Sequence, residues 1–166
     1  LLSDYQLVVI GVDDDVCREQ IEQRQLVAFD KKEMDAKTLA SHVALVKAMN
    51  QYNLRRVVSF HNLVAKARKF SEDFPHVNSW MSEYLRPSGK LWTSYVSGEM
   101  AIGNRDRILD RFRALKDEER GLLSNSRCLS EGVDIPTLDG VAFVDPRQSQ
   151  VDIIQAVGRA MRKAQD

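Results

Sequence analysis

The residues whose types and spacing could do chemistry lie near the end of the chain, where Gln155, Arg159 and Arg162 recur at helical intervals. An α-helix advances about 100° per residue, so these three side chains share one face, with Asp152 beside them and Gly158 at its border. Two guanidiniums on a rigid face, next to a glycine that allows close approach, suit a phosphate oxyanion. The opposite face is apolar and consists of Ile153, Ile154, Val157, Ala160 and Met161. We therefore predict a helix over residues 149–165 that is buried on one side.

The alternative interpretation is that the basic face of this helix is exposed to solvent and binds no ligand, which periodicity alone favours. The spacing Gln-x-x-Gly-Arg-x-x-Arg, from Gln155 to Arg162, adds information. It resembles the last motif of superfamily 2 helicases and translocases. Residues 126–136, Ser-Arg-Cys-Leu-Ser-Glu-Gly-Val-Asp-Ile-Pro, resemble the motif that precedes it in that family. The two motifs occur in the family's order and close together, which makes the resemblance specific.

The resemblance implies that this chain is the second RecA-like domain of such a motor, which faces a first domain across a cleft that holds ATP. It implies that Arg159 and Arg162 are arginine fingers for the γ-phosphate, a role that supplies about 10³ to 10⁵ in rate. Residues expected near the nucleotide are Gln155, Gly158, Gly132 and Asp134. Without the downstream arginines, Glu131-Gly-Val-Asp134 would be interpreted as a turn at a strand end.

Three further segments resemble nucleic-acid contacts of the same family. The residues expected to touch the nucleic acid are Phe60, His61, Asn62, Ser97, Gly98, Ser126 and Arg127. Phe60-His61 has an equally good alternative, a strand terminus with an internally satisfied histidine. The contacts would be made mainly to the phosphate backbone, so binding should be salt-sensitive and largely independent of sequence.

Departures from the family's complete motor are equally informative. The chain has no Gly-x-x-x-x-Gly-Lys-Ser/Thr loop, since Gly89-Lys90 is followed by Leu91. We interpret residues 117–120, Asp-Glu-Glu-Arg, as a solvated charged turn rather than a magnesium-binding box, and residues 13–15, Asp-Asp-Asp, as a solvated loop rather than a metal site. No metal ligand is therefore predicted. ATP with Mg²⁺ would be bound mainly by an N-terminal RecA-like domain, and the isolated fragment is expected to be inactive.

Bulk composition is that of an ordinary globular domain. The 166 residues include 24 basic and 24 acidic ones, so any nucleic-acid contact needs a local patch rather than a global field. Two separated cysteines suggest reduced thiols in the cytoplasm, and no apolar run approaches the length of a membrane span. Because the chain does not begin with Met, we expect a piece of a longer protein. We expect one domain, 1–166, with residues 1–30 as its lead-in.

The elements that must position these residues alternate along the chain. Expected strands cover residues 5–12, 57–60, 91–96, 121–126 and 141–144. Expected helices cover residues 35–49, 63–74, 104–115 and 149–165, with Asn62 capping the second of them and Pro75 ending it. Residues 76–90 should form a loop with one helical turn, and His42 should be a packed core residue. This alternation predicts an α/β fold, and with the resemblance a three-layer RecA-like domain with a mainly parallel sheet and helices on both faces.

We therefore predict the second motor domain of an ATP-dependent helicase or translocase. DNA is preferred over RNA as its partner, because residues 131–136 and 59–61 resemble the repair and restriction-type branch. One rival is a nucleic-acid- or protein-binding RecA-like module without ATPase activity, which a phosphate-loop domain upstream would exclude. Another is a small-molecule α/β enzyme that uses the strand ends, for which no nucleophile–base pair is evident.

Overall fold

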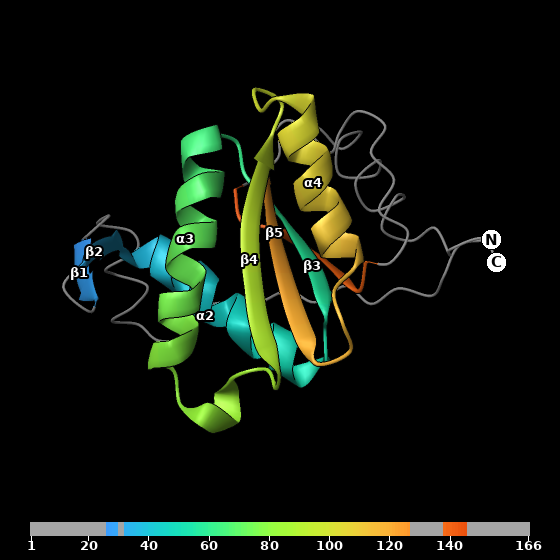
Figure 1. The fold of residues 1–166 in the computed structure, drawn as a ribbon. Coiled ribbons are helices and arrows are strands. Elements are labelled where there is room, and N and C mark those ends of the chain that lie inside the picture. The colour runs from blue at the N-terminus through green and yellow to red at the C-terminus, as the bar shows by residue number, and fades with distance from the viewer. Residues whose placement is uncertain (1–25, 30–31, 127–137, 146–166) are drawn as a thin grey trace.

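The computed structural model describes residues 26–29, 32–126 and 138–145, and within them four strands form the main sheet. These strands are β3 Arg56–Phe60, β4 Lys90–Ser97, β5 Glu119–Ser126 and β6 Gly140–Phe143. Their order across the sheet is β4-β5-β3-β6, and every neighbouring pair is parallel (Figure 1). Parallel neighbours need long crossovers, and helices α3 Val64–Trp80 and α4 Ile102–Arg113 lie in two of them.

The two faces of this sheet are covered by different helices. Because side chains alternate along a strand, Val57 and Leu122 pack on the core shared with α3 and with α2 Ala36–Gln51. Val58 and Leu123 point to the other face and pack against α4. Figure 1 shows α2 and α3 on one side of the strands and α4 on the other. The predicted three-layer α/β architecture is therefore confirmed.

Helix α2 illustrates how local sequence defines an element. Asp35 caps its start by accepting a hydrogen bond from the Thr38 amide (2.9 Å). At its end Asn53 adopts a left-handed φ of 52°, and the Leu54 amide donates back to the Met49 carbonyl (2.9 Å). Asparagine tolerates this left-handed conformation better than most residues, so Asn53 favours the end of the helix at this position.

His42 lies on the inner face of α2 and is fully buried. Its Nδ1 and Nε2 lie 2.7 Å and 3.2 Å from the carbonyl oxygens of Thr38 and Phe70. Its ring stacks on that of Phe70, with centroids 3.9 Å apart, and burial lowers the pKa of His42. The prediction of a packed core histidine is confirmed.

Helix α3 corrects two predictions. Pro75 does not end it, because the helix continues to Trp80 with Phe74 and Val77 both fully buried in the core. A proline inside a helix removes one hydrogen bond, and here the packing on either side outweighs that loss. Nor is Asn62 its cap, since the N-cap residue is Leu63, which makes no side-chain cap bond and is 49% exposed.

Smaller elements surround this core. Strands β1 Leu26–Phe29 and β2 Lys32–Asp35 form an antiparallel hairpin before α2. The predicted single helical turn in the loop after α3 is the 3₁₀ helix η1 Glu83–Leu85. None of the helices in the described ranges has both the length and the hydrophobicity needed to cross a bilayer. The predicted strand 5–12, the loop 13–15 and the helix 149–165 lie outside the described residues.

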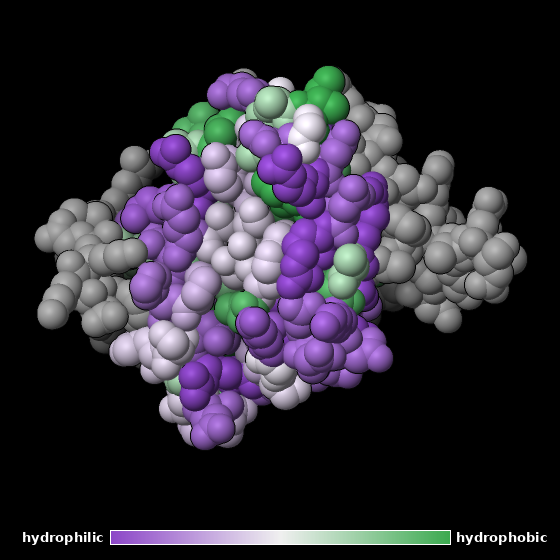
Figure 2. Space-filling view, viewed as in Figure 1, coloured by the Kyte–Doolittle hydropathy of each residue, from purple (hydrophilic) through white to green (hydrophobic). Residues whose placement is uncertain are grey.

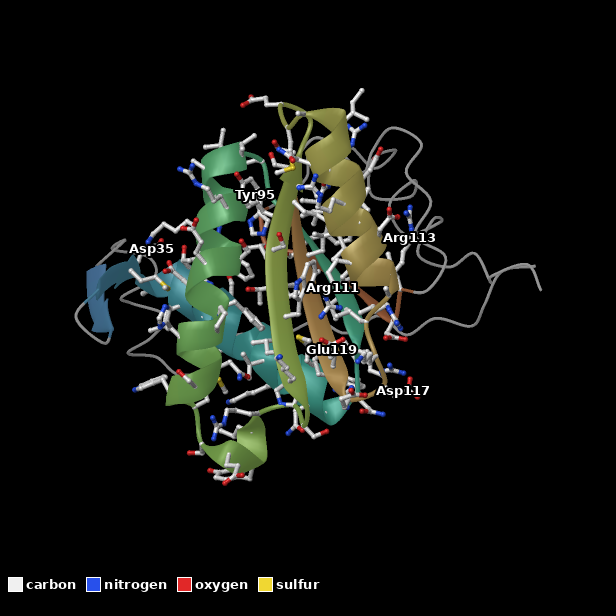
Figure 3. The ribbon with its side chains drawn as sticks, in the orientation of Figure 1. Asp35, Tyr95, Arg111, Arg113, Asp117 and Glu119 are labelled. Atoms are coloured by element: carbon white, nitrogen blue, oxygen red, sulfur yellow. The ribbon has the colours of Figure 1, made fainter. Side chains whose placement is uncertain are left out.

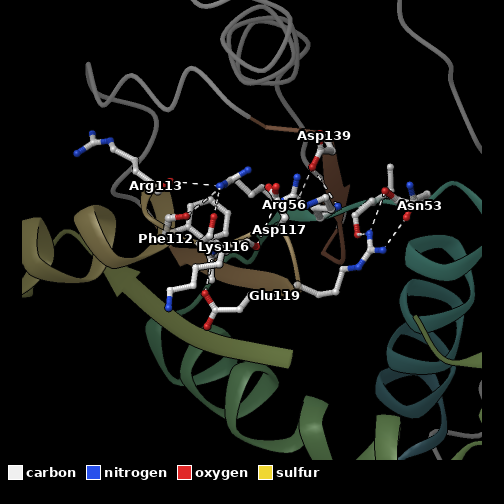
Figure 4. Close-up of polar contacts among 12 residues, drawn as sticks. Asn53, Arg56, Phe112, Arg113, Lys116, Asp117, Glu119 and Asp139 are labelled. Carbon is white, nitrogen blue, oxygen red and sulfur yellow. Dashed lines mark hydrogen bonds and ion pairs between the residues drawn. The ribbon is translucent and has the colours of Figure 1, made fainter. Parts of the chain in front are cut away.

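The amino end of the sheet, where β3 and β5 begin, is held by side chains that bond to backbone groups. The Asp139 carboxylate accepts from the backbone amides of Arg55 (3.0 Å) and Arg56 (2.8 Å). The Arg56 guanidinium donates to the carbonyl oxygens of Arg113 (3.3 Å) and Leu115 (2.6 Å), where α4 ends (Figure 4). The last carbonyl groups of an α-helix have no intrahelical donors, and the positively charged Arg56 side chain supplies hydrogen bonds at this end of α4.

Arg120 is the second centre of this network and is 8% exposed. Its guanidinium donates to the carbonyl oxygens of Ser88 (2.9 Å), Asn53 (3.1 Å) and Leu54 (3.2 Å), and to the Asn53 side chain (2.6 Å). It thereby ties the start of β5 to the end of α2 and to the loop before β4.

The predicted charged turn at residues 117–120 is only half correct. Asp117 and Glu118 are exposed, but Glu119 and Arg120 are buried and begin β5. Arg111 of α4 forms an ion pair with Glu119 (Figure 3). The hydrogen bond from Arg111 and that from the Lys116 amide lower the pKa of Glu119 to about 2. Half of the charged segment that the sequence predicts to be exposed is thus buried and forms hydrogen bonds within the domain.

Candidate functional site

Three predicted contact segments, far apart in the sequence, meet at the carboxyl end of the sheet, where β3, β4 and β5 end. Strand register places Phe60 opposite Asn125 and Ser97 opposite Ser126. Beyond the strands, the Gly98 amide still donates to the Ser126 carbonyl (3.3 Å). The predicted residues that the structure brings together are Phe60, His61, Asn62, Ser97, Gly98 and Ser126.

These residues differ in accessibility. Asn62 and Gly98 are exposed, whereas Phe60, His61, Ser97 and Ser126 are buried. Leu63 and Ile102 also lie exposed at this end, the latter at 67%. Figure 2 shows hydrophobic residues at the top of the view, where β4 ends, although the outer faces of α3 and α4 are mainly hydrophilic. The accessible part of the site is therefore loop backbone with apolar side chains beside it.

Ser126 and Ser124 of β5 are fully buried but differ in their hydrogen bonding. Ser124 Oγ accepts from Ser59 Oγ of β3 (3.0 Å). Ser126 Oγ finds no hydrogen-bond partner among the described groups, which is uncommon for a buried hydroxyl. Leaving such a group unpaired costs on the order of 1–3 kcal/mol, so Ser126 Oγ is a candidate for a contact outside the described residues.

His61 is 4% exposed and its Nε2 lies 3.0 Å from Ser59 Oγ. Its ring packs at 51° against Phe70, with centroids 4.8 Å apart. Burial lowers the pKa of His61 to about 4, against the smaller opposing effect of the nearby Asp145 carboxylate. The imidazole is thus neutral near pH 7 and internally bonded, as the alternative interpretation of Phe60-His61 expects. A contact between His61 and nucleic acid stays a prediction.

Asp145, which sequence analysis missed, organises the loop after β3. Its carboxylate is largely buried and accepts from the Asn62 amide (3.1 Å) and from Lys66 Nζ (3.0 Å). Burial alone would raise the pKa of Asp145, but these two hydrogen bonds and the Lys66 charge lower it. A signal was present, since an acid directly after the predicted strand 141–144 must lie at the carboxyl end of the sheet.

The remaining predicted site residues lie outside the described residues. They are Arg127, Gly132, Asp134, Gln155, Gly158, Arg159 and Arg162. Within the described ranges, no three His, Cys, Asp or Glu side chains are grouped so that they could hold a metal ion. The described geometry of the site therefore covers the ends of the strands and not Gln155, Arg159 and Arg162.

The family profile described as the helicase conserved C-terminal domain matches residues 38–164. The chain belongs to this helicase C-terminal domain family. It is the C-terminal RecA-like domain of a superfamily 2 helicase-like protein, as the two sequence motifs predicted.

Several proteins are similar to this helicase C-terminal domain. "Putative helicase 22" of Sulfolobus islandicus filamentous virus is 27% identical over 124 residues, which are 75% of this chain and 19% of that protein. "Putative ATP-dependent helicase IRC3" of Saccharomyces cerevisiae is 31% identical over 93 residues, 56% of this chain and 13% of the yeast protein.

Among solved structures, the ATP-dependent Type ISP restriction-modification enzyme LlaBIII bound to DNA superposes with a TM-score of 0.65 and 30% identity. The match covers 89% of this chain and 10% of LlaBIII. The chain thus spans no more than a fifth of the length of these relatives, since the matches cover 19%, 13% and 10% of them.

Proposed function

We propose that this helicase C-terminal domain is the second motor domain of an ATP-dependent DNA helicase or translocase. The observation that carries the proposal is that β3, β4 and β5 all end at one edge of a parallel sheet, with Asn62 and Gly98 exposed just beyond two of these ends. Open α/β sheets bind their ligands outside the carboxyl ends of the strands, where such loops meet. The family to which the chain belongs supplies the class of protein.

Nucleic acid would be held by the exposed loop backbone at Asn62 and Gly98, with Arg127 as a cationic contact. Phe60, His61, Ser97 and Ser126 are buried, so in this proposal they shape the loops from beneath. Ser126 Oγ, which has no hydrogen-bond partner among the described residues, would bond a phosphate oxygen if it became exposed.

The nucleotide would be contacted by the motif residues that follow β5 and β6 in the sequence. Arg159 and Arg162 would place positive charge where negative charge develops on the transferred phosphoryl group, and Gln155 would link that response to nucleic acid. Gly132, Asp134 and Gly158 would border the nucleotide. ATP supplies the free energy of its hydrolysis, which the paired motor domains convert into movement along a strand.

Magnesium is assigned to an N-terminal RecA-like domain rather than to this chain. The sequence lacks a phosphate-binding loop, and no three His, Cys, Asp or Glu side chains in the described part of the chain are grouped around a possible metal position. In this proposal the chain alone does not hydrolyse ATP. DNA is preferred over RNA because the similar LlaBIII structure is bound to DNA.

The direct test replaces Arg162 by Ala in the full-length protein that contains this chain. ATP turnover should fall by about 10³-fold or more, while nucleotide affinity changes little, because an arginine finger acts on the transition state. Turnover is measured by phosphate release and affinity by titration of a fluorescent nucleotide.

Arg68→Ala is the matched control, since Arg68 is an exposed arginine on α3 with no assigned role. It should retain wild-type turnover. Equal turnover in Arg162→Ala and wild type would remove the finger assignment. A wild-type protein that binds nucleic acid but never hydrolyses ATP would favour the rival binding module.

A further inference from the structure

Strand β4 lies at one end of the strand order, so one of its two sides has no strand beside it among the described residues. Figure 1 views the sheet from this side, with β4 in front of β5 and flanked by α3 and α4. Figure 2 shows a pale, weakly polar stripe along β4 between the hydrophilic outer faces of the two helices. Residues 90–95 are exposed or half-buried, so this edge of the sheet is accessible from the side that the figures show.

Hydrogen bonds at the two ends of β4 show which of its backbone groups point outward. The Lys90 amide donates to the Glu118 carbonyl (2.8 Å) and the Gly98 amide to the Ser126 carbonyl (3.3 Å), so the even-numbered residues face β5. Consecutive residues of a strand direct their amide and carbonyl groups to opposite sides. The residues whose groups point away from the sheet are therefore Leu91, Thr93 and Tyr95. No hydrogen bond within the described ranges uses these outward groups.

The sequence of β4 contains nothing that blocks such an edge. Natural edge strands are kept short, or they carry charges, prolines or bulges that prevent pairing with other chains. β4 has 8 residues, and after Lys90 it contains no charge, proline or glycine and is rich in aromatic and β-branched residues. The opposite edge of the described sheet, β6, has only 4 residues. An open strand of this kind is the geometry to which an extended peptide adds as a further strand.

Side chains hold β4 in place from both faces. Trp92 packs against Phe112 of α4, with ring centroids 5.8 Å apart, and the Arg111 guanidinium lies 5.9 Å from the Trp92 ring. Leu91 points to the other face and packs on the core shared with α2 and α3. The outward backbone groups are thus presented in a fixed geometry, which lowers the entropy cost of binding a partner.

The charges beside β4 favour an acidic partner. A shallow hollow of about 470 Å³ lies where β4 begins and α4 ends, and it is lined by Lys90, Arg111, Ala114, Lys116, Glu118 and Glu119. Arg111 and Glu119 form an ion pair with each other, which leaves Lys90 and Lys116 opposed by Glu118 alone. An acidic side chain near the end of an added strand would therefore meet an excess of positive charge.

A second copy of this chain is a poorer occupant. Two β4 strands paired about a twofold axis would bring the two α4 helices side by side, because each face of one sheet continues into the same face of the other. Arg111 lies beside β4, and Arg107 is one turn earlier on the same side of α4. Such a pairing would place exposed arginines of both copies close together, which is unfavourable.

We propose that the outer edge of β4 is a docking site for an extended, acidic segment of a protein partner, which adds to the sheet as a further strand. Its backbone would bond to the outward groups of Leu91, Thr93 and Tyr95, and its carboxylates would reach Lys90 and Lys116. The inference does not depend on the proposed function, because this edge runs along the side of the sheet and not across the strand ends.

Binding of a fluorescein-labelled peptide to the 166-residue chain, measured by anisotropy, tests the proposal. The peptide is as long as β4, alternates Thr and Val, and carries Glu at both ends. It should bind, and methylation of alternate backbone nitrogens should weaken binding by about tenfold or more, since this removes hydrogen bonds to the strand. The same peptide with Lys at both ends should bind at least about threefold more weakly.

Thr93→Pro is the sharpest variant, because proline removes an outward amide and is tolerated on a strand edge whose amide faces solvent. It should weaken peptide binding by about tenfold and leave the melting temperature near that of wild type. Thr93→Ala retains the amide, so it is the matched control and should bind like wild type. Lys90→Glu reverses an exposed charge and should weaken binding of the Glu-ended peptide while strengthening that of the Lys-ended one.

Several outcomes would overturn the inference. They are no binding of the Glu-ended peptide, equal binding of its methylated and unmethylated forms, and full affinity in a folded Thr93→Pro variant. Displacement of the peptide by single-stranded DNA would assign the edge to nucleic acid, and a wild-type dimer that Thr93→Pro dissociates would assign it to a second copy. Either result replaces the proposal. If Thr93→Pro does not fold, the methylated peptide and Lys90→Glu decide.

Discussion

The two ends of the parallel sheet use their polar groups differently. At the amino end, Arg56, Arg120 and Asp139 bond to backbone groups of α4, α2 and β3, so their bonding capacity serves the fold. At the carboxyl end, a buried hydroxyl on Ser126 lacks a described partner and Ile102 is exposed. Among the described residues, side chain–backbone hydrogen bonds therefore hold the first end together, whereas the second end keeps a buried hydroxyl without a described partner.

This difference separates stability from function within one sheet. Substitutions at the amino end should lower the free energy of unfolding, because they remove hydrogen bonds that join one element to the backbone of another. Substitutions of incompletely satisfied groups at the carboxyl end should change stability little and change binding more, since functional sites often carry a local stability cost.

The largest effect is expected for Arg120→Met. Removing the guanidinium leaves the carbonyl oxygens of Ser88, Asn53 and Leu54 without their donor, which should cost about 4 kcal/mol of unfolding free energy. Urea denaturation of the isolated domain measures it. Arg68→Met, at an exposed site on α3, should change stability by less than about 0.5 kcal/mol. Equal stability of the two variants would break the comparison.

The second effect concerns pH at the carboxyl end. The pKa of His61 is lowered from 6.5 to about 4 by burial, so the unfolded chain takes up this proton first and stability falls as the pH drops from 6.5 to 4. At pH 4 the loss from this group is about 3 kcal/mol. His61→Gln should remove that part of the pH dependence of unfolding.

The exposed His76 of α3 gives the matched control for this measurement. His76→Gln should keep the wild-type slope between pH 7 and pH 4 in urea denaturation. An unchanged slope in His61→Gln would mean that the buried imidazole does not resist protonation.

The smallest effect compares two serines of β5. Ser126→Ala removes a buried hydroxyl with no described partner and should be neutral or stabilising by about 1 kcal/mol. Ser124→Ala breaks the bond with Ser59 and should destabilise by about 1 kcal/mol. Thermal melting checks both, and salt-dependent DNA binding should weaken only for Ser126→Ala. Destabilisation by both variants to the same extent would contradict the asymmetry.

The sequence was sufficient for the layers of the fold because β-strands and helices alternate with clear periodicity. It was insufficient where tertiary contacts outweigh local preference. Pro75 remains helical because Phe74 and Val77 beside it are buried, and Glu119 is buried because Arg111 lies eight positions earlier on α4. Neither contact can be inferred from the helix or strand propensities of the neighbouring residues.

The candidate site was predictable in outline for a similar reason. Strand ends are visible in the sequence, so the meeting of Phe60, Ser97 and Ser126 follows once the strands are parallel. The bond from the Asn62 amide to Asp145 could not be predicted, since it depends on which strand lies beside β3. Strand order is a property of the whole chain.

Strand β6 has a consequence for how the protein is made. It pairs with β3, although residues 140–143 leave the ribosome long after residues 57–60. During that interval one side of β3 has no neighbour, and an unpaired strand invites association with other chains. We therefore expect the nascent domain to depend on chaperones, or on a slow rate of synthesis, until β6 has emerged.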